Sequence, residues 1–432
     1  MSDFPAPATL PRILAGLRTQ GSMALDHHIE VHGALPLFAH RRRDSGALIE
    51  VLERSGLRGR GGAAFPTATK MKAVIASRGR ATVVANACEG EPASFKDRLL
   101  LERLPQLVID GALLAAQAVD AAEVFIAVDA GASLAARSIQ RALRERTDAS
   151  RNRTRVRLVP VPPGYVSGQE SAVVNYLNGG PAKPTATPPP IFRRGVNGRP
   201  TLVNNVETLA HIALIARHGA AWFRELGTQT DPGSTLVTLG GAVVDPGVFE
   251  IEAGAPLASL VDAAGGLSAP LRAFLVGGYA GTWVTATAAD ELALGSDELG
   301  EVGASLGAGV IIALPSSACP VAEIASVGRW LSDQSAGQCG PCVNGLDAIA
   351  TTLEQIRAGG DPRTLGRISR WASLAHGRGA CAHPDGVVRF IRSAIDVFET
   401  EFADHTRSGP CTACLQRQLL PTPTARLSRA AA

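Results

Sequence analysis

The sequence is poor in aromatic and charged residues. Phe, Trp and Tyr together make up 4% of the 432 residues, and Asp, Glu, Lys and Arg make up 19%. Few aromatic rings leave few platforms on which nucleic-acid bases stack, and a net charge of +3 creates no strong basic field. Nucleic-acid binding is therefore excluded as the main role. With 46% hydrophobic residues, the chain is too apolar to be disordered and can fill several cores.

The sequence also has no long unbroken apolar run. Its longest uncharged stretch, Val302 to Ala322, is interrupted by Gly, Pro and Ser, whereas a membrane-spanning helix needs roughly 20 continuous apolar residues. The first residues, Met1 to Pro5, lack the basic and apolar regions of a secretory signal. We therefore expect a cytoplasmic protein without a membrane span. Cysteines stay reduced there, so clustered cysteines indicate metal ligands or redox groups rather than disulfides.

The hydrophobic pattern divides the chain into three regions after an N-terminal arm, residues 1–45. Apolar runs at 81–85, 124–128 and 156–161 read as buried strands, and 104–119 and 134–146 as helices between them. This alternation predicts a parallel sheet covered by helices. Short strands at 236–239, 247–251 and 273–276 around a helix at 257–264 predict a small β-grasp module. The last region, with apolar faces along 343–356 and 387–402, is helical, and a Pro- and Arg-rich tail follows residue 406.

A glycine-rich loop is the first chemical signal. The segment Gly56–Pro66 reads GLRGRGGAAFP, in which glycines let the backbone approach an anion and Arg58 and Arg60 add positive charge. Such patterns arise easily in a chain with 46 glycines, so a plain turn is an equally good interpretation of this loop alone.

Three further polar segments follow predicted strands or precede a helix. They are Asn86–Pro92, Tyr165–Glu170 and the pair Asn204–Asn205. Each one alone is explained by capping and turn chemistry. Because ligands bind at the carboxyl ends of strands in open α/β sheets, the four segments together favour a ligand site.

These motifs, with SFKDR at 94–98, RPTLVNNVETLA at 199–210 and QCGPC at 338–342, occur in a characteristic order. Together they resemble the flavin- and NADH-binding subunit of bacterial NADH:quinone oxidoreductase and the related subunits of NAD-linked hydrogenases and formate dehydrogenases. The resemblance covers about residues 46–405. It implies a Rossmann-like flavin domain (46–228), a β-grasp SLBB domain (232–318) and a helical iron–sulfur domain (322–405), with a flexible tail from 406.

The resemblance also implies the positions of the cofactor and donor sites. The FMN and nucleotide positions of the family match Gly59, Arg60, Gly61, Gly62, Phe65, Lys70, Asn86, Glu89, Gly168, Gln169, Asn204 and Asn205. Two carboxylates that contact the nucleotide, Glu91 and Glu170, are retained as candidate catalytic residues. The family has Asp at the position of Cys88 and Glu at that of Gln169, so each change removes a carboxylate near the flavin.

The NADH site departs further from the family pattern. An aromatic residue that helps to stack the dinucleotide is replaced by Ala73, and a lysine and a phenylalanine of a proline-rich loop are replaced by Thr187 and Pro190. Each aromatic contact contributes about 0.5–1.5 kcal/mol beyond its area burial. We therefore expect weak NADH binding or a different donor.

The cysteines match three of the four cluster ligands of the family. Cys339, Cys342 and Cys381 are predicted to hold a [4Fe–4S] cluster, while Ala336 occupies the position of the first cysteine. A lone CxxC is also a zinc or redox motif, which leaves zinc as an alternative. The fourth ligand stays open between His383, Cys319, a tail cysteine and water. If the last helix ran straight from 385 to 404, Cys411 and Cys414 would lie away from Cys381, as a partner contact or as exposed thiols.

The sequence therefore predicts an oxidoreductase subunit that passes electrons from a donor, NADH by resemblance, through FMN and a [4Fe–4S] cluster. The acceptor would be a ferredoxin-like protein or a quinone reductase complex. One alternative is an FMN and iron–sulfur module without NADH activity. Another is a cofactor-free scaffold subunit, which the absence of yellow-brown absorbance would reveal.

Overall fold

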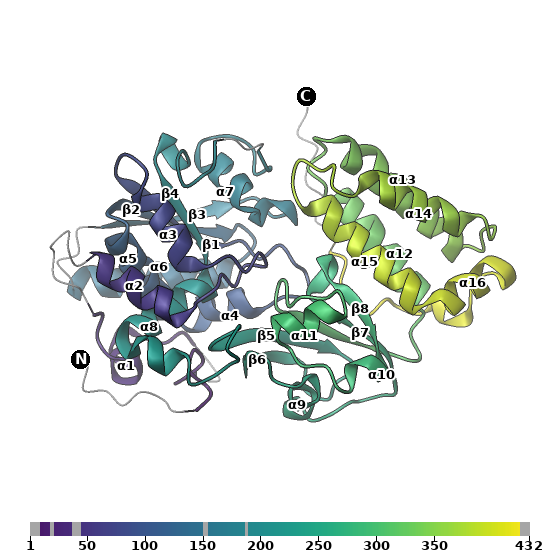
Figure 1. The fold of residues 1–432 in the computed structure, drawn as a ribbon, viewed down its shortest axis with the longest axis horizontal. Helices are drawn as coiled ribbons and strands as arrows, with labels where there is room; N and C mark the ends of the chain where they lie inside the picture. The colour runs from purple at the N-terminus through teal and green to yellow at the C-terminus, as the bar shows by residue number, and fades with distance from the viewer. Residues whose placement is uncertain (1–8, 18–20, 37–44, 150–153, 186–188, 424–432) are drawn as a thin grey trace.

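The structure is a computed structural model that describes the chain except residues 1–8, 18–20, 37–44, 150–153, 186–188 and 424–432. Its first half is built around a four-stranded sheet in the order β3-β2-β1-β4, in which every neighbouring pair is parallel (Figure 1). The parallel sheet predicted from the apolar runs is confirmed. Residues 201–205, where the apolar runs indicated no strand, form a fourth strand. The strands are β1 (Ala81–Ala87), β2 (Ala121–Asp129), β3 (Arg155–Val161) and β4 (Thr201–Asn205).

Helices cover both faces of this sheet. Val83 and Ala85 pack with the helices of one face, whereas Val84 packs toward α7 on the other. Gly111 allows the tightest helix contact, because a Cβ there would lie 1.8 Å from the carbonyl oxygen of Leu209. One face is covered by α2 (Ser45–Ser55), α4 (Lys96–Arg103), α5 (Pro105–Ala118), α6 (Ser133–Ala149) and α8 (Val206–Phe223); α3 (Thr67–Ile75) follows the glycine-rich loop, and α7 is Glu170–Leu177.

The described part of the predicted N-terminal arm is packed rather than free. Ile13 is fully buried, and α1 (Leu25–His32) places His28 against Asp110 of α5 with a 2.9 Å contact. The backbone N–H groups of Arg12, Ile13 and Leu14 donate to the carboxylate of Glu250 in the second sheet. This segment therefore links the first two regions of the molecule.

The second region is a five-stranded mixed sheet in the order β6-β5-β9-β7-β8. The three predicted strands and the predicted helix are confirmed, while β8 and β9 are additional strands that the hydrophobic pattern did not indicate. Most of β9 is apolar, and it lies in the centre of the sheet inside the uncharged stretch that ends at Ala322. The elements are β5 (Ser234–Gly241), β6 (Gly247–Glu252), α9 (Leu257–Ala263), β7 (Leu271–Val276), β8 (Thr282–Thr285), α10 (Ala286–Ala289), α11 (Ser296–Glu301) and β9 (Val310–Pro315).

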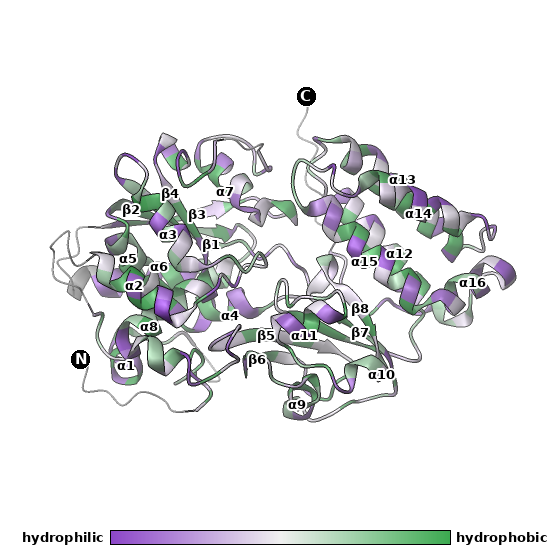
Figure 2. Cartoon of the chain, viewed as in Figure 1, coloured by the Kyte–Doolittle hydropathy of each residue, from purple (hydrophilic) through white to green (hydrophobic). Residues whose placement is uncertain are grey.

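The third region is helical, as predicted. Figure 2 shows hydrophobic and hydrophilic stripes along these helices, and the apolar stripe includes the buried residues Ile349, Leu353 and Ile391. Val343, assigned to the same face, is instead 53% exposed, because it lies in the π-helical turn η4 (Pro341–Leu346). The helices are α12 (Pro320–Asp333), α13 (Asp347–Arg357), α14 (Thr364–Ala375), α15 (His383–Val397) and α16 (Glu399–Ser408).

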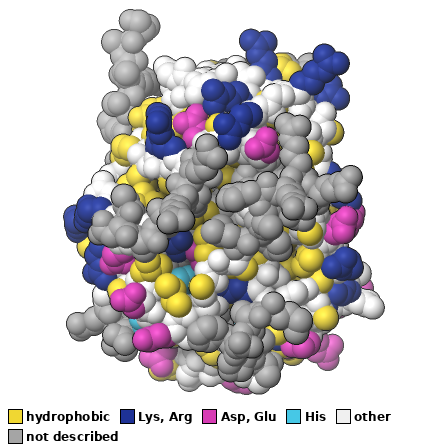
Figure 3. Space-filling model, turned by 90° about the vertical axis from the view of Figure 1, so that its left-hand side faces the viewer, with side chains coloured by type: hydrophobic (Ala, Val, Ile, Leu, Met, Phe, Trp, Pro, Cys, Tyr) yellow, Lys and Arg dark blue, Asp and Glu magenta, His cyan; other side chains and the backbone are white. Residues whose placement is uncertain are grey.

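Two further observations concern the surface. Among the described residues, no helix combines the length and the apolar character that crossing a bilayer requires. Figure 3 shows acidic and basic side chains interspersed on the end of the molecule formed by the first region. This mixture agrees with a net charge close to zero and with the absence of a single strong field.

Candidate functional site

The strand order of the first sheet creates a switch point between β1 and β4. From β1 the chain proceeds outward through β2 to β3, and it then returns to place β4 on the other side of β1. In open parallel sheets, a crevice for ligands forms where the strand order reverses, beyond the carboxyl ends of the strands. Asn86 and Asn205 are register partners at that edge, so both predicted site residues lie at the switch point.

The glycine-rich loop reaches the same edge. It closes on itself through a hydrogen bond from Gly59 N–H to the Phe65 carbonyl (2.9 Å), and Gly62 has a φ of 95° that favours glycine. A Cβ on Gly61 would lie 3.2 Å from Cβ of Asn205, so the loop sits directly against the end of β4. Among the described residues, the backbone N–H groups of Gly61 and Gly62 have no hydrogen-bond partner, which leaves them available to an anion.

The loops after β1 and β3 pack against each other at this edge. Asn86 Nδ2 donates to the carbonyl of Gly168 (2.7 Å), and a Cβ on Gly168 would lie only 2.5 Å from the carbonyl oxygen of Cys88. Gly90 approaches the backbone of Tyr165 in the same way, because its Cβ would lie 2.7 Å from that carbonyl oxygen. The four segments singled out in the sequence therefore converge, as predicted.

Lys70 brings a positive charge to this edge of the sheet. Its Nζ donates to Glu170 Oε2 (2.9 Å) and to the carbonyl of Val203 (2.7 Å), next to Asn204. Two neutral polar groups at the same edge, Asn204 Nδ2 and Ser167 Oγ, are buried without a partner among the described residues. Buried polar groups are nearly always hydrogen-bonded, so these two fit a site completed by a bound polar ligand.

Several predicted cofactor residues also have structural roles. Glu89 accepts hydrogen bonds from the N–H groups of Asp97 (3.1 Å) and Arg98 (3.0 Å) at the start of α4. Gln169 Oε1 caps α7 by accepting from Ser171 N–H (2.7 Å), and Asn205 Oδ1 caps α8 by accepting from Glu207 N–H (2.9 Å). Capping requires only an acceptor oxygen, so a glutamine serves at position 169.

Glu91, predicted to be catalytic, is buried at the contact with the second sheet. Its carboxylate accepts from Tyr279 N–H (2.8 Å) and Ala93 N–H (3.5 Å). Burial raises the pKa of Glu91 to about 7. Burial likewise raises the pKa of the Cys88 thiol, so a neutral thiol stands at the position where the family has an aspartate.

Known proteins share both the flavin-site segments and the helical region. Residues 52–214 match the model of the Nuo51 FMN-binding domain, and residues 322–405 match that of the NADH-ubiquinone oxidoreductase-F iron-sulfur binding region. The F subunit numbered 2 of the NADH-quinone oxidoreductase of Rhizobium meliloti (strain 1021) is 32% identical over 378 residues, which span 84% of this chain and 90% of the relative. The chain belongs to the family of NADH-quinone oxidoreductase F subunits.

Another F subunit and one solved structure are also similar to this chain. The F subunit of the NADH-quinone oxidoreductase of Escherichia coli (strain K12) is 32% identical over 82% of this chain and 83% of the relative. The crystal structure of an NAD+-reducing [NiFe]-hydrogenase in the H2-reduced state is similar with a TM-score of 0.79 and 32% identity. That match covers 84% of this chain but only 63% of the hydrogenase chain.

A buried ion network lies beside the glycine loop, and the sequence did not reveal it. Lys96 Nζ contacts Asp97 Oδ1 (2.8 Å) and Glu207 Oε2 (2.9 Å) and donates to the Arg60 carbonyl (3.2 Å). The motif SFKDR was part of the resemblance, but it gave no sign that its lysine is buried between two carboxylates. Burial disfavours the ammonium, but Asp97 and Glu207 outweigh this and raise the pKa of Lys96.

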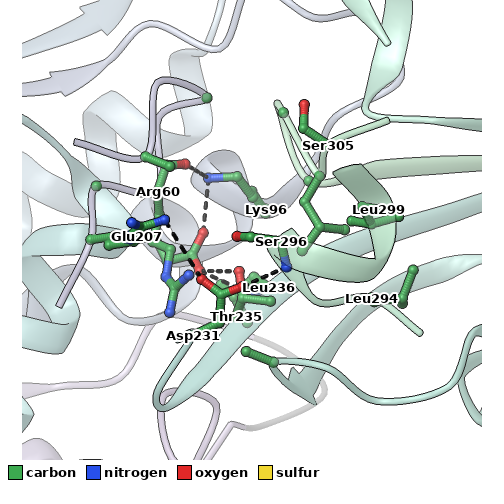
Figure 4. Close-up of a pocket in the computed structure, with 18 residues that line it drawn as sticks. Arg60, Lys96, Glu207, Asp231, Thr235, Leu236, Leu294, Ser296, Leu299 and Ser305 are labelled. Carbon is green, nitrogen blue, oxygen red and sulfur yellow. Dashed lines mark hydrogen bonds and ion pairs between the residues drawn. The ribbon is translucent and has the colours of Figure 1, made fainter. Parts of the chain in front are cut away.

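This network forms the floor of a cavity of about 120 Å³ between the glycine loop and the second sheet (Figure 4). The Arg60 side chain donates through Nη2 to the carbonyl of Ser234 (3.0 Å). Arg60 therefore ties the glycine loop to β5. Nη2 of its guanidinium is thereby engaged by the protein, while Nε is buried without a partner among the described residues.

The residues predicted for the NADH site are only partly described. Phe65 ends the glycine loop and is 52% exposed, as a ring available for stacking would be. Ala73 lies in α3 and is half-buried, and Pro190 is half-buried as well. Thr187 lies outside the described residues.

The three predicted cluster cysteines lie at one end of the helical region. Burial opposes ionisation of Cys339, but N–H groups of Ala380 and Cys342 hydrogen-bond its sulfur and lower its pKa. This places Cys339 next to both Cys342 and the segment that precedes Cys381. Ala336 is buried, and among the predicted positions it contributes no ligand atom.

His383, a candidate for the fourth ligand, is held by the protein through one ring nitrogen. Its Nε2 contacts the Leu331 carbonyl (2.9 Å), while Nδ1 is buried with no partner among the described residues. Burial lowers the pKa of His383 to about 4, so the ring is neutral at pH 7. The other candidate, Cys319, lies elsewhere, because its sulfur is 3.2 Å from that of Cys414.

Proposed function

We propose that the chain is an electron-transfer oxidoreductase subunit of the same type as the NADH-quinone oxidoreductase F subunits, with FMN at the switch point between β1 and β4. The observation that supports this most is the convergence of four predicted segments there, around two buried polar groups without partners, on Asn204 and Ser167. In this proposal the first sheet with its helices is a Rossmann-like flavin domain (46–228). The second sheet is an SLBB β-grasp domain (232–318), and the helices of 322–405 form the iron–sulfur domain.

The residues at the switch point suit a flavin phosphate and ring system. Gly61 and Gly62 offer unpaired N–H groups to an anion, and Lys70 offers a cation at the end of β4. Asn86, Asn204 and Asn205 would supply amide groups from adjacent strands. Lys70 contacts Glu170 (2.9 Å), and we infer that the lysine exchanges this contact, in part or entirely, for the cofactor.

The helical region provides ligands for three of the four irons of a [4Fe–4S] cluster. Cys339, Cys342 and Cys381 would be the thiolate ligands, and the position of Ala336 leaves one iron without a family ligand. When bound, FMN and the cluster convert two-electron to one-electron transfer. The protein residues fix their positions and surroundings. The acceptor would be a ferredoxin-like protein or another electron-transfer subunit of a complex.

The donor would be NADH by family membership, with Glu91 and Glu170 at the nucleotide. A second candidate function, an FMN and iron–sulfur module without NADH activity, is favoured by Ala73 and Pro190, which supply no stacking ring. Losing two of three aromatic contacts, at about 0.5–1.5 kcal/mol each, would weaken nucleotide binding by roughly one to two orders of magnitude.

The test is cofactor analysis of anaerobically purified protein, with flavin and iron measured per chain. The double substitution Lys70→Ala with Asn204→Ala should remove most of the flavin. Lys72→Ala is a matched control in the same helix, because Lys72 is 51% exposed and pairs only with Glu53 at the surface. Normal flavin content in the double variant would refute the site, and colourless wild-type protein would support a scaffold role. Rapid flavin bleaching by micromolar NADH would refute the second candidate.

A further inference from the structure

Four side chains that are metal ligands in many proteins meet where α12, α16 and the tail come together. They are Cys319, His405, Cys411 and Cys414, and their ligand atoms all lie within 4.8 Å of one another. Cys414 Sγ lies 3.2 Å from Cys319 Sγ, 3.2 Å from His405 Nε2 and 3.6 Å from Cys411 Sγ. No other group of three or more such side chains is this compact in the part of the chain that the structure describes.

The surroundings orient each ligand toward the common centre. His405 Nδ1 contacts the Glu401 carbonyl (2.7 Å), so Nδ1 carries the proton and Nε2 is left with a free lone pair facing the sulfurs. Cys319 is the N-cap residue of α12, and its sulfur accepts from Ala322 N–H (3.4 Å).

Cys411 and Cys414 form a CxxC turn whose backbone N–H groups point toward the sulfur of Cys411. The backbone N–H of Cys414 donates to the Cys411 carbonyl (3.1 Å), and the N–H groups of Ala413 and Cys414 also hydrogen-bond Cys411 Sγ. Hydrogen bonds of this kind stabilise negative charge on a ligand sulfur. Cys411 is exposed while the other three residues are buried, so the centre has one route to solvent.

We propose that Cys319, His405, Cys411 and Cys414 bind one zinc ion in a structural, four-coordinate site. Zn²⁺ bound to sulfur at about 2.3 Å and to nitrogen at about 2.0–2.1 Å in a tetrahedron separates its ligand atoms by roughly 3.5–3.8 Å. Four of the six distances between the ligand atoms are 3.2–3.6 Å and all six are within 4.8 Å, which is close to this spacing. A four-iron cube has one ligand at each corner iron, so its ligand atoms stand further apart than these do.

The zinc site is separate from the cysteines assigned to the iron–sulfur cluster. Cys319 precedes α12, whereas Ala336 and Cys339 follow its last residue, Asp333. A helix of 14 residues is about 21 Å long. The two groups therefore lie at opposite ends of α12, and neither Cys319 nor the tail cysteines supply the missing fourth ligand of the cluster.

The site explains why the described part of the tail, up to residue 423, is packed against the helices although the sequence predicts a flexible tail. Beyond Cys414 the chain runs back along α12, where Leu419 N–H (2.7 Å) and Leu420 N–H (3.0 Å) donate to Glu323. Further on, the Pro423 carbonyl accepts from Trp330 Nε1–H (2.9 Å). A metal bound at Cys411 and Cys414 fixes the start of this tail segment, and the hydrogen bonds to α12 hold residues 419–423.

The first test is metal analysis of the full-length protein by inductively coupled plasma mass spectrometry. We expect about one zinc per chain, and its nearly complete loss in Cys319→Ala and in Cys414→Ala. The matched control is the triple variant with Cys339, Cys342 and Cys381 changed to alanine, which should lose iron and keep zinc. Zinc that persists in Cys319→Ala, or iron that is lost with the zinc ligands while the fold is intact by circular dichroism, would overturn the proposal.

A second measurement keeps the proposal testable if the variants fail to fold. Wild-type protein treated with a chelator should be cleaved by trypsin after Arg417 faster than untreated protein, and added Zn²⁺ should restore resistance. Added Co²⁺ should instead give the intense visible bands of a tetrahedral thiolate complex. Wild-type protein that contains no zinc and shows a Cys319–Cys414 disulfide by mass spectrometry would refute the site.

Discussion

Replacing Lys96 with methionine tests the network that joins the glycine loop to the rest of the structure. The Lys96 ammonium is the cation that contacts both Asp97 and Glu207, and these three residues are 3%, 5% and 0% exposed. Methionine preserves most of the side-chain volume but leaves two buried carboxylates facing each other. Breaking a buried ion pair from one side costs about 3–5 kcal/mol. We expect the lower end, about 3 kcal/mol, because Glu207 keeps hydrogen bonds from Thr235 and Leu236.

The loss of stability in Lys96→Met should depend on pH. Burial opposes ionisation of Glu207, but Lys96, His211 and Arg60 outweigh it and lower the pKa of Glu207 below its usual range. The stability that results is present above the pKa of an unfolded glutamate, and it disappears as the pH falls through the lower folded pKa. In Lys96→Met the carboxyl pKa rises, so protonation relieves the unpaired charge. The difference in stability from wild type should therefore be larger at pH 7.5 than at pH 5.5.

Thermal unfolding followed by circular dichroism at these two pH values is the assay. If the first domain unfolds cooperatively, about 3 kcal/mol corresponds to a fall in Tm of roughly 6–12 °C at pH 7.5. The double variant with Glu207→Gln added should recover part of the loss, because the second buried charge is then removed. A Tm within about 2 °C of wild type, or a larger fall at pH 5.5 than at pH 7.5, would show that the network does not stabilise the fold in this way.

Four further outcomes are expected. Gly168→Ala should lower flavin content while the fold persists, because a Cβ would lie 2.5 Å from the Cys88 carbonyl oxygen and push the loops apart; flavin and circular dichroism are measured together. Glu91→Gln should be more stable than wild type above pH 7 and no more stable below pH 4.5, because the raised pKa of about 7 adds stability that is fully present below the unfolded value and lost as the pH rises. Ala73→Phe should lower the KM for NADH several-fold in a steady-state assay by restoring a stacking ring, and an unchanged KM would argue for a different donor. Because Ala336 provides no thiolate, mild oxidation should release one iron, and electron paramagnetic resonance should then show a three-iron signal.

The fold was predictable where the residues of one short segment are enough to determine its secondary structure. The strands at 81–87 and 121–129 contain continuous apolar runs, and such runs fold as buried strands wherever they meet a sheet. The strand at 201–205 ends in two asparagines and takes its strand conformation from pairing with β1, a partner distant in sequence. The break at Phe398 was likewise invisible, because a helical pattern continues through it; its φ of −115° turns α16 and the tail toward Cys319.

The candidate site was predictable as a set of loops but not as a set of contacts. Glycine and asparagine motifs identified the segments around Asn86, Gly168 and Asn204, because these residue types are needed for close backbone approach and for amide contacts. The Lys96 network and the grouping of Cys319 with His405 depend on which distant residues meet, and no local pattern encodes that. The roles of the individual cofactor residues remain predictions for the measurements described above.

The hydrogen bonds from Arg12, Ile13 and Leu14 to Glu250 have a consequence for biosynthesis. Arg12 is synthesised 238 residues before its partner Glu250 in β6. At about 5–20 residues per second, this segment waits roughly 12–50 s before it can dock. The first region therefore cannot complete its packing before β6 is made, and a nascent chain that stops before β6 would keep this segment open to chaperones and proteases.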